Sequence, residues 1–279
     1  MIWVTWRQHR QEGLWVLLAV AILAGSTAFI THELSLAHCA PQPAAFCIPN
    51  DAAGVLAQSL LRFDLVQYGL VVLPALAGAF IGAPLVAREV ENGTERLAWT
   101  QGVTRSRWLF VKLALVFTPL LAASGLVGFL EVLLINAEGS QANHWSFFDQ
   151  QAPLTIGATA FAMALGVAVG AVVGKSVPAM AVMLVGFVVT RVGIAELARP
   201  HYMNPLVFTT QDPSRVQVGA GPDWWLDLPN LRQQGGTVLL HYQPQDRFWT
   251  FQSIETAILV TLAAILLGFA VGWVTRQVT

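Results

Sequence analysis

The sequence predicts an all-α membrane protein: one transmembrane domain over 1–279, with six transmembrane helices. Hydrophobic residues make up 55% of the chain and charged residues only 11%, whereas soluble domains carry about 25% charged residues. The mean hydropathy is +0.60. Six apolar runs also approach the roughly 20 residues that a helix needs to cross a bilayer. These runs cover 14–30, 66–86, 109–135, 153–173, 177–195 and 254–274.

Aromatic and basic side chains precede the first run, among them Trp6, Arg7 and Arg10. Such residues favour the headgroup region of a membrane, so the segment predicts an interfacial helix. A charge cluster that only orients the first span is the alternative. We expect 14–30 to be a retained span and not a signal peptide, because no small-residue cleavage site follows it directly.

Orientation follows from the basic residues, which are enriched on the cytoplasmic side of membrane proteins. They gather before the first span, over 87–112, at Lys175 and at Arg276. This distribution predicts a multi-pass protein of the cell membrane with both termini in the cytoplasm. The segments 31–65 and 196–253 are then extracellular.

The two cysteines of the chain, Cys39 and Cys47, both lie in the predicted extracellular segment 31–65. Outside the cytoplasm such a pair favours a disulfide over a metal site, and free thiols are the alternative. The second extracellular segment mixes Pro, Gly and Asp with tryptophans and contains a β-like run at 237–242. It predicts a small extracellular lobe.

Three ionisable residues fall late in predicted spans: Glu131 in the third, and Arg191 and Glu196 at the end of the fifth. Charges in the hydrocarbon region are costly and require a reason. One interpretation is a structural ion pair or snorkelling to the interface. The other is that these residues line a substrate path.

Glycines recur at helical spacing in two of the spans, as Gly78 and Gly82 in one and Gly166, Gly170 and Gly174 in the other. Small residues spaced in this way let membrane helices approach closely. The pattern therefore predicts two helix-packing faces.

Two motif-like strings do not match their motifs. The run from Gly170 to Ser176 resembles a nucleotide phosphate loop, but it has three residues between its glycines where that motif requires four. His32 is followed by His38, six positions on, whereas a helical zinc-protease motif requires four. We therefore predict no catalytic residue, no metal site and no cofactor in this chain.

A polar island at 87–108 separates the second and third spans. We expect it to continue the second span as a helix, to bend at Gly93, and to start a new helix near Arg105. The result would be a rigid, charged cytoplasmic element. A solvated loop that only orients the protein is the alternative.

Within the island, the charged run Arg88 to Leu97 is followed by the basic turn Val103 to Trp108 and then by Lys112. This order resembles the membrane subunits of type-2 ABC exporters, which carry an acidic element after the second of six spans and then a basic turn. The opening residues, Thr5 to Arg10, are similar to an actinobacterial branch of that family. The resemblance implies a coupling helix that docks on an ATPase subunit. The implied contact residues are Arg88, Glu89, Glu91, Gly93, Thr94, Glu95 and Arg96. The implied interfacial residues beside them are Trp6, Arg7, Arg10, Arg105, Arg107 and Lys112. Many members have a proline before the basic turn, where this chain has Gln101-Gly102.

By resemblance the chain would be a permease subunit that exports a hydrophobic or amphipathic substrate, such as a lipid, a peptide antibiotic or a drug. ATP and Mg would bind the separate ATPase, and a second permease chain, favoured as an identical copy, would complete the path among membrane lipids. A net charge of −1 gives no reason to expect a nucleic-acid partner. The alternatives are a membrane-embedded enzyme and an antibiotic-sensing or immunity protein acting at the outer face.

Overall fold

The computed structural model describes residues 72–93, 105–137, 144–210, 223–226, 232–234 and 237–276, with single positions between Leu18 and His32. In this part of the chain five helical segments are long and apolar enough to cross a membrane, and they correspond to the second to sixth predicted spans. They are Val72–Asn92, Arg107–Leu133, Ala152–Val173, Ser176–His201 and Gln245–Arg276. The predicted first span, 14–30, lies mostly outside the described residues, although its described positions are helical.

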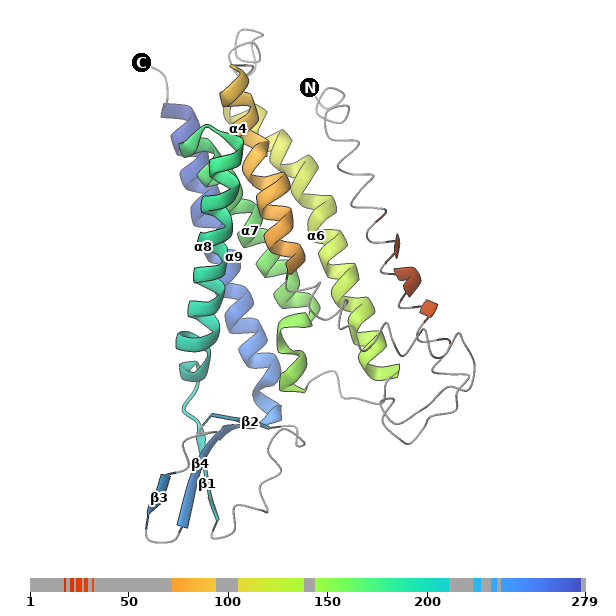
Figure 1. Cartoon of the computed structure of the whole chain (residues 1–279), viewed down its shortest axis with the longest axis vertical. Helices are drawn as coiled ribbons and strands as arrows, with labels where there is room; N and C mark the ends of the chain where they lie inside the picture. Colours follow the sequence, from red (N-terminus) through yellow and green to blue (C-terminus); the bar gives the residue numbers. More distant parts are fainter. Residues whose placement is uncertain are drawn as a thin grey trace.

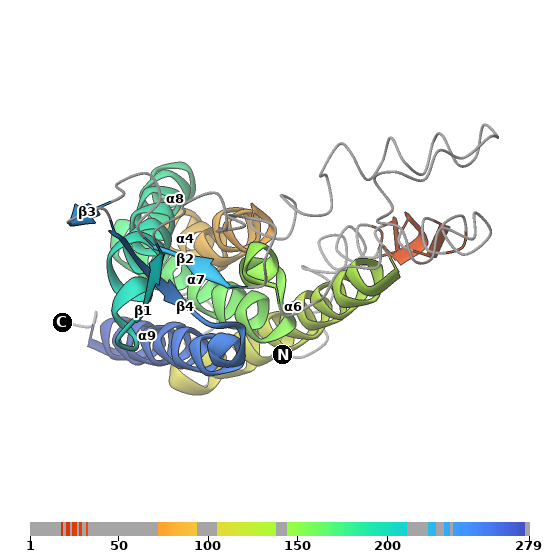
Figure 2. The ribbon, with the colours of Figure 1, turned by 90° about the horizontal axis from the view of Figure 1, so that it is seen from below.

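The five segments run lengthwise beside one another, and a small sheet lies at one end of the bundle (Figure 1). We call this the sheet end, and the end where α4 (Ala83–Asn92) and α9 (Phe248–Arg276) finish the α4 end. Helix α7 (Ala152–Val173) is the central helix, as the end-on view of Figure 2 shows. It packs against α4, α6 (Arg105–Ala137), α8 (Ser176–Gly193) and α9. The bundle is therefore organised around α7.

The second span passes through a π-helical turn, η2 (Gly78–Gly82), and continues as α4 to Asn92. The helix continues past the predicted span and stops at Gly93, whose φ of 66° lies in the left-handed region. The Gly93 N–H donates to the Val90 carbonyl oxygen at 3.3 Å, which closes the last turn. Glycine adopts this conformation without the steric cost that other residues incur, so the predicted bend at Gly93 has a local cause.

Helix α6 (Arg105–Ala137) is the longest, with 33 residues. At 1.5 Å per residue it measures about 50 Å, well beyond a hydrocarbon core of about 30 Å. It starts at Arg105, as the sequence predicts, and its first turns therefore extend past the apolar run into the charged region beside α4.

Helices α7 and α8 (Ser176–Gly193) are joined by a connection of two residues. Gly174 ends α7 in the left-handed region, with φ 65°, and Lys175 is extended. Because the connection is so short, the two helices run antiparallel and side by side (Figure 1). Gly174 thus terminates a helix, and a Cβ there would lie 3.1 Å from the Val90 Cγ1 on α4, so it also belongs to the predicted packing face.

The other predicted small-residue positions also form a close helix contact. A Cβ on Gly170 would lie 2.3 Å from the Ala83 carbonyl oxygen, and one on Gly166 would lie 2.4 Å from the Gly78 carbonyl oxygen. A Cβ on Gly82 would lie 3.0 Å from the Met163 carbonyl oxygen. The two predicted glycine faces are therefore packed against each other, with backbone against backbone, between α7 and the η2–α4 segment.

Helix α8 continues through a π turn, η4 (Ile194–Ala198), and a 3₁₀ turn, η5 (Arg199–His201), so the helical path passes the predicted end at 195. At the other side of the lobe, η7 (Gln245–Arg247) leads directly into α9 at Phe248, ahead of the predicted start at 254. The non-helical part of the lobe is correspondingly shorter than 196–253.

The segment between η5 and η7 contains an antiparallel sheet, so the chain is mostly rather than wholly helical. Its strands are β1 (Leu206–Thr210), β2 (Trp224–Trp225), β3 (Arg232–Gln234) and β4 (Thr237–Gln243). Strand β4 lies between β1 and β2 and also pairs with β3. Its register with β1 runs from Leu206 opposite Tyr242 to Thr210 opposite Val238. The predicted β-like run at 237–242 is therefore a strand.

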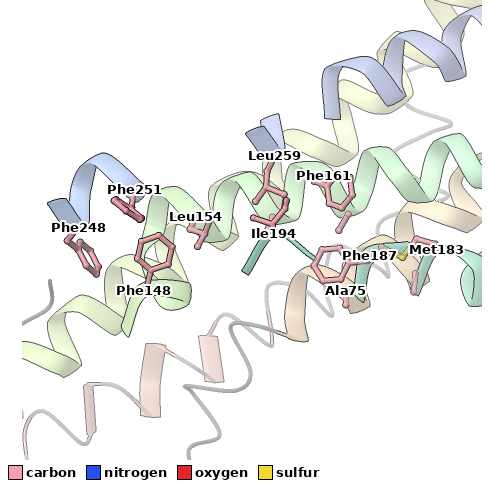
Figure 3. Close-up of a cluster of buried hydrophobic side chains, with 13 residues drawn as sticks. Ala75, Phe148, Leu154, Phe161, Met183, Phe187, Ile194, Phe248, Phe251 and Leu259 are labelled. Atoms are coloured by element: carbon pink, nitrogen blue, oxygen red, sulfur yellow. The ribbon is translucent and has the colours of Figure 1, made fainter. Parts of the chain in front are cut away.

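Most apolar side chains inside the bundle belong to two buried clusters, and Figure 3 shows the one nearer the sheet end. It joins η3 (Trp145–Gln150) to α7, α8 and α9 through Phe148, Phe187, Phe248 and Phe251. The Trp145 ring stacks on Phe148 at 5.6 Å between centroids. These rings fix the short η3 segment against the start of α9.

The outer face of α8 is apolar and exposed, with Val177, Val185 and Val189 between 64% and 74% accessible. A soluble protein rarely leaves such a continuous apolar face in water. A bilayer is a solvent in which this face is stable, so the pattern agrees with a membrane-spanning bundle.

Candidate functional site

The last turn of α4 carries most of the described residues of the predicted coupling element. Arg88 and Glu91 are exposed, Glu89 is half-buried, and Gly93 closes the turn. The predicted contacts Thr94, Glu95 and Arg96 lie outside the described residues, as do Trp6, Arg7 and Arg10.

Glu89 forms an ion pair with Lys112, which lies two turns into α6. Lys112 is buried, and its ammonium group also lies 5.4 Å from the centroid of the Trp108 ring. An ammonium over an indole face gains a further electrostatic attraction. Lys112 thus holds α6 against α4 in the structure, and its interfacial role stays a prediction.

Glu91 reaches the first residue of α8. Its Oε2 accepts a hydrogen bond from the Ser176 N–H at 3.1 Å and a second from the Ser176 Oγ at 2.9 Å. The first N–H groups of a helix have no partner inside that helix, and a carboxylate there is also favoured by the helix dipole. Glu91 therefore acts as a cap for α8, supplied from α4.

The start of α6 completes this end of the described structure. Arg105 is its first residue, and Arg107 is exposed. Arg88 and Arg107 are thus two exposed cations of the predicted coupling element, while Glu89 and Glu91 make contacts within the bundle.

A second polar group lies at the sheet end, where two arginines and two carboxylates form a charge-balanced cluster. Glu255 on α9 accepts from Arg191 at 2.6 Å and from Arg199 through Nε at 2.8 Å. Asp149 on η3 accepts from Arg191 at 2.8 Å and from Arg199 at 2.6 Å. We call Asp149, Arg191, Arg199 and Glu255 the charge cluster.

The surroundings of the charge cluster are apolar and aromatic. The Glu255 side chain is 0% exposed, whereas that of Asp149 is 36% exposed. The Arg199 guanidinium lies 4.3 Å from the centroid of the Phe148 ring. Buried charges persist only when paired and hydrogen-bonded, and each member of this cluster meets both conditions.

Two groups beside the bundle have shifted pKa values. Burial alone would raise the pKa of the Asp149 carboxyl, but the guanidiniums of Arg199 and Arg191 outweigh it and hold that pKa below its usual range. Burial, reinforced by the negative charge of Glu255, raises the pKa of Tyr202 to about 12. Asp149 is therefore ionised and Tyr202 neutral at physiological pH.

The three in-span residues predicted from the sequence do not form one group in the structure. Arg191 belongs to the charge cluster, Glu196 is exposed on η4, and Glu131 is buried on α6. For Arg191 the structure supports the ion-pair interpretation.

Sequence reasoning missed Asp149, Arg199 and Glu255. One signal was available, because Glu255 stands at the start of the last apolar run, where an acidic residue needs a partner. Asp149 and Arg199 flank spans and carry no comparable signal. Within the described ranges no group of three or more His, Cys, Asp or Glu side chains could hold a metal ion.

A family model described as "ABC-2 membrane transporter related" matches residues 12–199. That range includes three of the described spans, nearly all of Ser176–His201, and the whole polar island. No curated protein matches the chain, and no solved structure does.

Proposed function

Because the chain belongs to the ABC-2 membrane transporter-related family, we propose that it is the permease subunit of an ABC exporter. In this proposal it forms the path for a hydrophobic or amphipathic substrate and has no nucleotide site of its own. A separate ATPase subunit binds ATP and Mg and supplies the energy. A second permease chain, an identical copy in the simplest assembly, completes the path.

The observation that carries the proposal is the pair of exposed cations, Arg88 at the end of α4 and Arg107 at the start of α6. Both lie inside the region matched by the family model and near the ends of membrane-length helices. The helices that carry them are tied to each other by the Glu89–Lys112 ion pair. A partner that docks on Arg88 and Arg107 would therefore move α4 and α6 together.

The positive-inside distribution supports an arrangement in which the α4 end faces the cytoplasm and the sheet end faces outward. Both termini are then cytoplasmic, and the ATPase binds at the α4 end. The resemblance of the segment 5–10 to an actinobacterial branch supports a place in that branch. A lipid, a peptide antibiotic and a small drug are all compatible with so apolar a bundle.

The experiment is a mild-detergent purification from the native host, with ATP hydrolysis assayed on the eluate. We expect a stoichiometric ATPase subunit to copurify, and the double variant Arg88→Glu/Arg107→Glu to lose it. Arg276→Glu is the matched control, because Arg276 is an exposed cation at the same end of the bundle. A folded wild-type chain that brings down no ATPase would contradict the proposal and favour an outer-face enzyme or an immunity protein.

A further inference from the structure

The side chain that caps the start of α8 comes from another helix. Lys175 occupies the N-cap position and makes no capping hydrogen bond with its side chain. An ammonium group has only donors, so it cannot satisfy the first N–H groups of the helix. Serine, threonine, aspartate or asparagine normally fills that position. Here the acceptor comes from Glu91, 85 residues earlier in the chain.

The same turn of α4 also holds α6. Glu89 and Glu91 are two residues apart, which places their side chains about 200° apart around the helix axis. Glu89 meets Lys112 on one side, and Glu91 meets Ser176 on the other. The last turn of α4 is therefore joined to α6 and to α8 at once.

The body of α4 has little freedom to rotate between these two contacts. Its first residue, Ala83, is in backbone contact with Gly166 and Gly170 of α7. Ala83, Leu85, Val86 and Ala87 are all buried. If a partner displaces the exposed end of α4, the helix therefore cannot respond only by rotating about its own axis.

We propose that Glu91 is a positioning residue that makes α8 move with the end of α4, and not a residue that contacts the ATPase. This inference rests on the proposed function, because it assigns a route within this chain for the motion that the ATPase starts. Ser176 is only 9% exposed, so it cannot itself be part of a docking surface.

Electron paramagnetic resonance distances between α4 and α8 test the route. Spin labels are attached through ketone-bearing unnatural side chains at Asn92 and Val177, which leaves Cys39 and Cys47 untouched. Both positions are exposed. The complex with its copurified ATPase is measured without nucleotide and after trapping with MgATP and vanadate.

We expect the wild type to give one narrow distance distribution that is the same in both states. Glu91→Ala should broaden it and make it differ between the states. Glu91→Gln keeps an acceptor oxygen and should restore most of the wild-type behaviour. Ser176→Ala should have a smaller effect than Glu91→Ala and add nothing to it in the double variant.

The matched control is Arg88→Ala, which changes an exposed residue in the same turn. It should weaken ATPase capture and leave the label distance unchanged. Glu91→Ala should instead leave ATPase capture unchanged and broaden the distance distribution. A Glu91→Ala distribution identical to that of the wild type in both states, combined with lost ATPase capture, would overturn the inference and make Glu91 a docking residue.

Failure of the proposed function would look different. If the wild type captures no ATPase, the label distance in the isolated chain still reports whether Glu91 holds α8 to α4. A distribution that is narrow in the wild type and broad in Glu91→Ala would show that Glu91 holds α8 to α4. The ATPase would then not be the source of their motion.

Discussion

The Arg199 guanidinium donates two hydrogen bonds to the Glu255 carboxylate, from Nε to Oε2 and from Nη2 to Oε1, both at 2.8 Å. The two residues are 56 positions apart. A bidentate guanidinium–carboxylate pair fixes orientation as well as distance. It therefore sets how the end of the α8–η5 segment stands against the first turns of α9.

Removing the Glu255 carboxylate should be strongly destabilising. Glu255→Ala leaves two buried guanidiniums with Asp149 as their remaining partner in the charge cluster, and breaking such a buried pair costs about 3–5 kcal/mol. A thermal shift assay in detergent should show a large fall in Tm. Glu196→Ala, at an exposed carboxylate in the same region, should change Tm little. Equal melting of the two variants would contradict the buried pairing.

Acidification should weaken the charge cluster through Asp149. Its pKa is lowered in the folded protein from an ordinary value of 3.8. The stabilisation is therefore fully present above that ordinary value and is lost as pH falls through the lower, folded value. Tm measured from pH 7 to pH 3 should fall more for the wild type than for Asp149→Asn. Parallel pH profiles would show that Asp149 does not contribute in this way.

Glycine substitutions should separate packed from open helix faces. Gly170→Ala places a methyl group 2.3 Å from the Ala83 carbonyl oxygen, whereas Gly268→Ala meets nothing within 4 Å. Overpacking of this kind costs about 1–3 kcal/mol. Size-exclusion profiles after heating should show early aggregation for Gly170→Ala only. If both variants behaved alike, the close contact between α7 and α4 would be in doubt.

The Glu89–Lys112 pair should show energetic coupling. Contacting charged residues typically give interaction energies of about 0.5–3 kcal/mol in a double-mutant cycle. Glu89→Gln and Lys112→Met should each lower Tm, and the double variant should lose less than the two single effects together. Strict additivity would mean that the ion pair does not contribute to stability.

Cys39 and Cys47 lie outside the described residues, and their disulfide is a prediction from the sequence. Intact mass after alkylation should show no modified cysteine before reduction and two after it. Two modified cysteines without reductant would establish free thiols.

The sequence predicts the described spans well because each is a long apolar run, and length with composition is enough to define a membrane helix. The helix ends were harder to place. The fifth span passes 195 because η4 and η5 continue it through residues that read as loop, such as Glu196 and Pro200. Similarly, α9 starts at Phe248 because aromatic side chains of its first turn are buried against η3 and Trp145.

Most of the polar contacts could not be predicted from the sequence. The family resemblance implies that Glu91 contacts an ATPase, which stays a prediction, and no local feature of the sequence identifies its neighbour in the fold, Ser176. Asp149 and Arg199 are 50 residues apart and meet because the fold brings η3 beside η5. Pairs that are distant in sequence are set by tertiary packing, and hydropathy carries no information about them.

The charge cluster also has a consequence for biogenesis. The ribosome completes η3, α8 and η5 before it makes α9, so Arg191 and Arg199 enter the membrane region ahead of Glu255. A nascent or truncated chain that lacks α9 carries one excess positive charge in the cluster, next to aromatic rings that α9 has yet to cover. The cluster thus becomes charge-balanced only when Glu255 of α9 joins it.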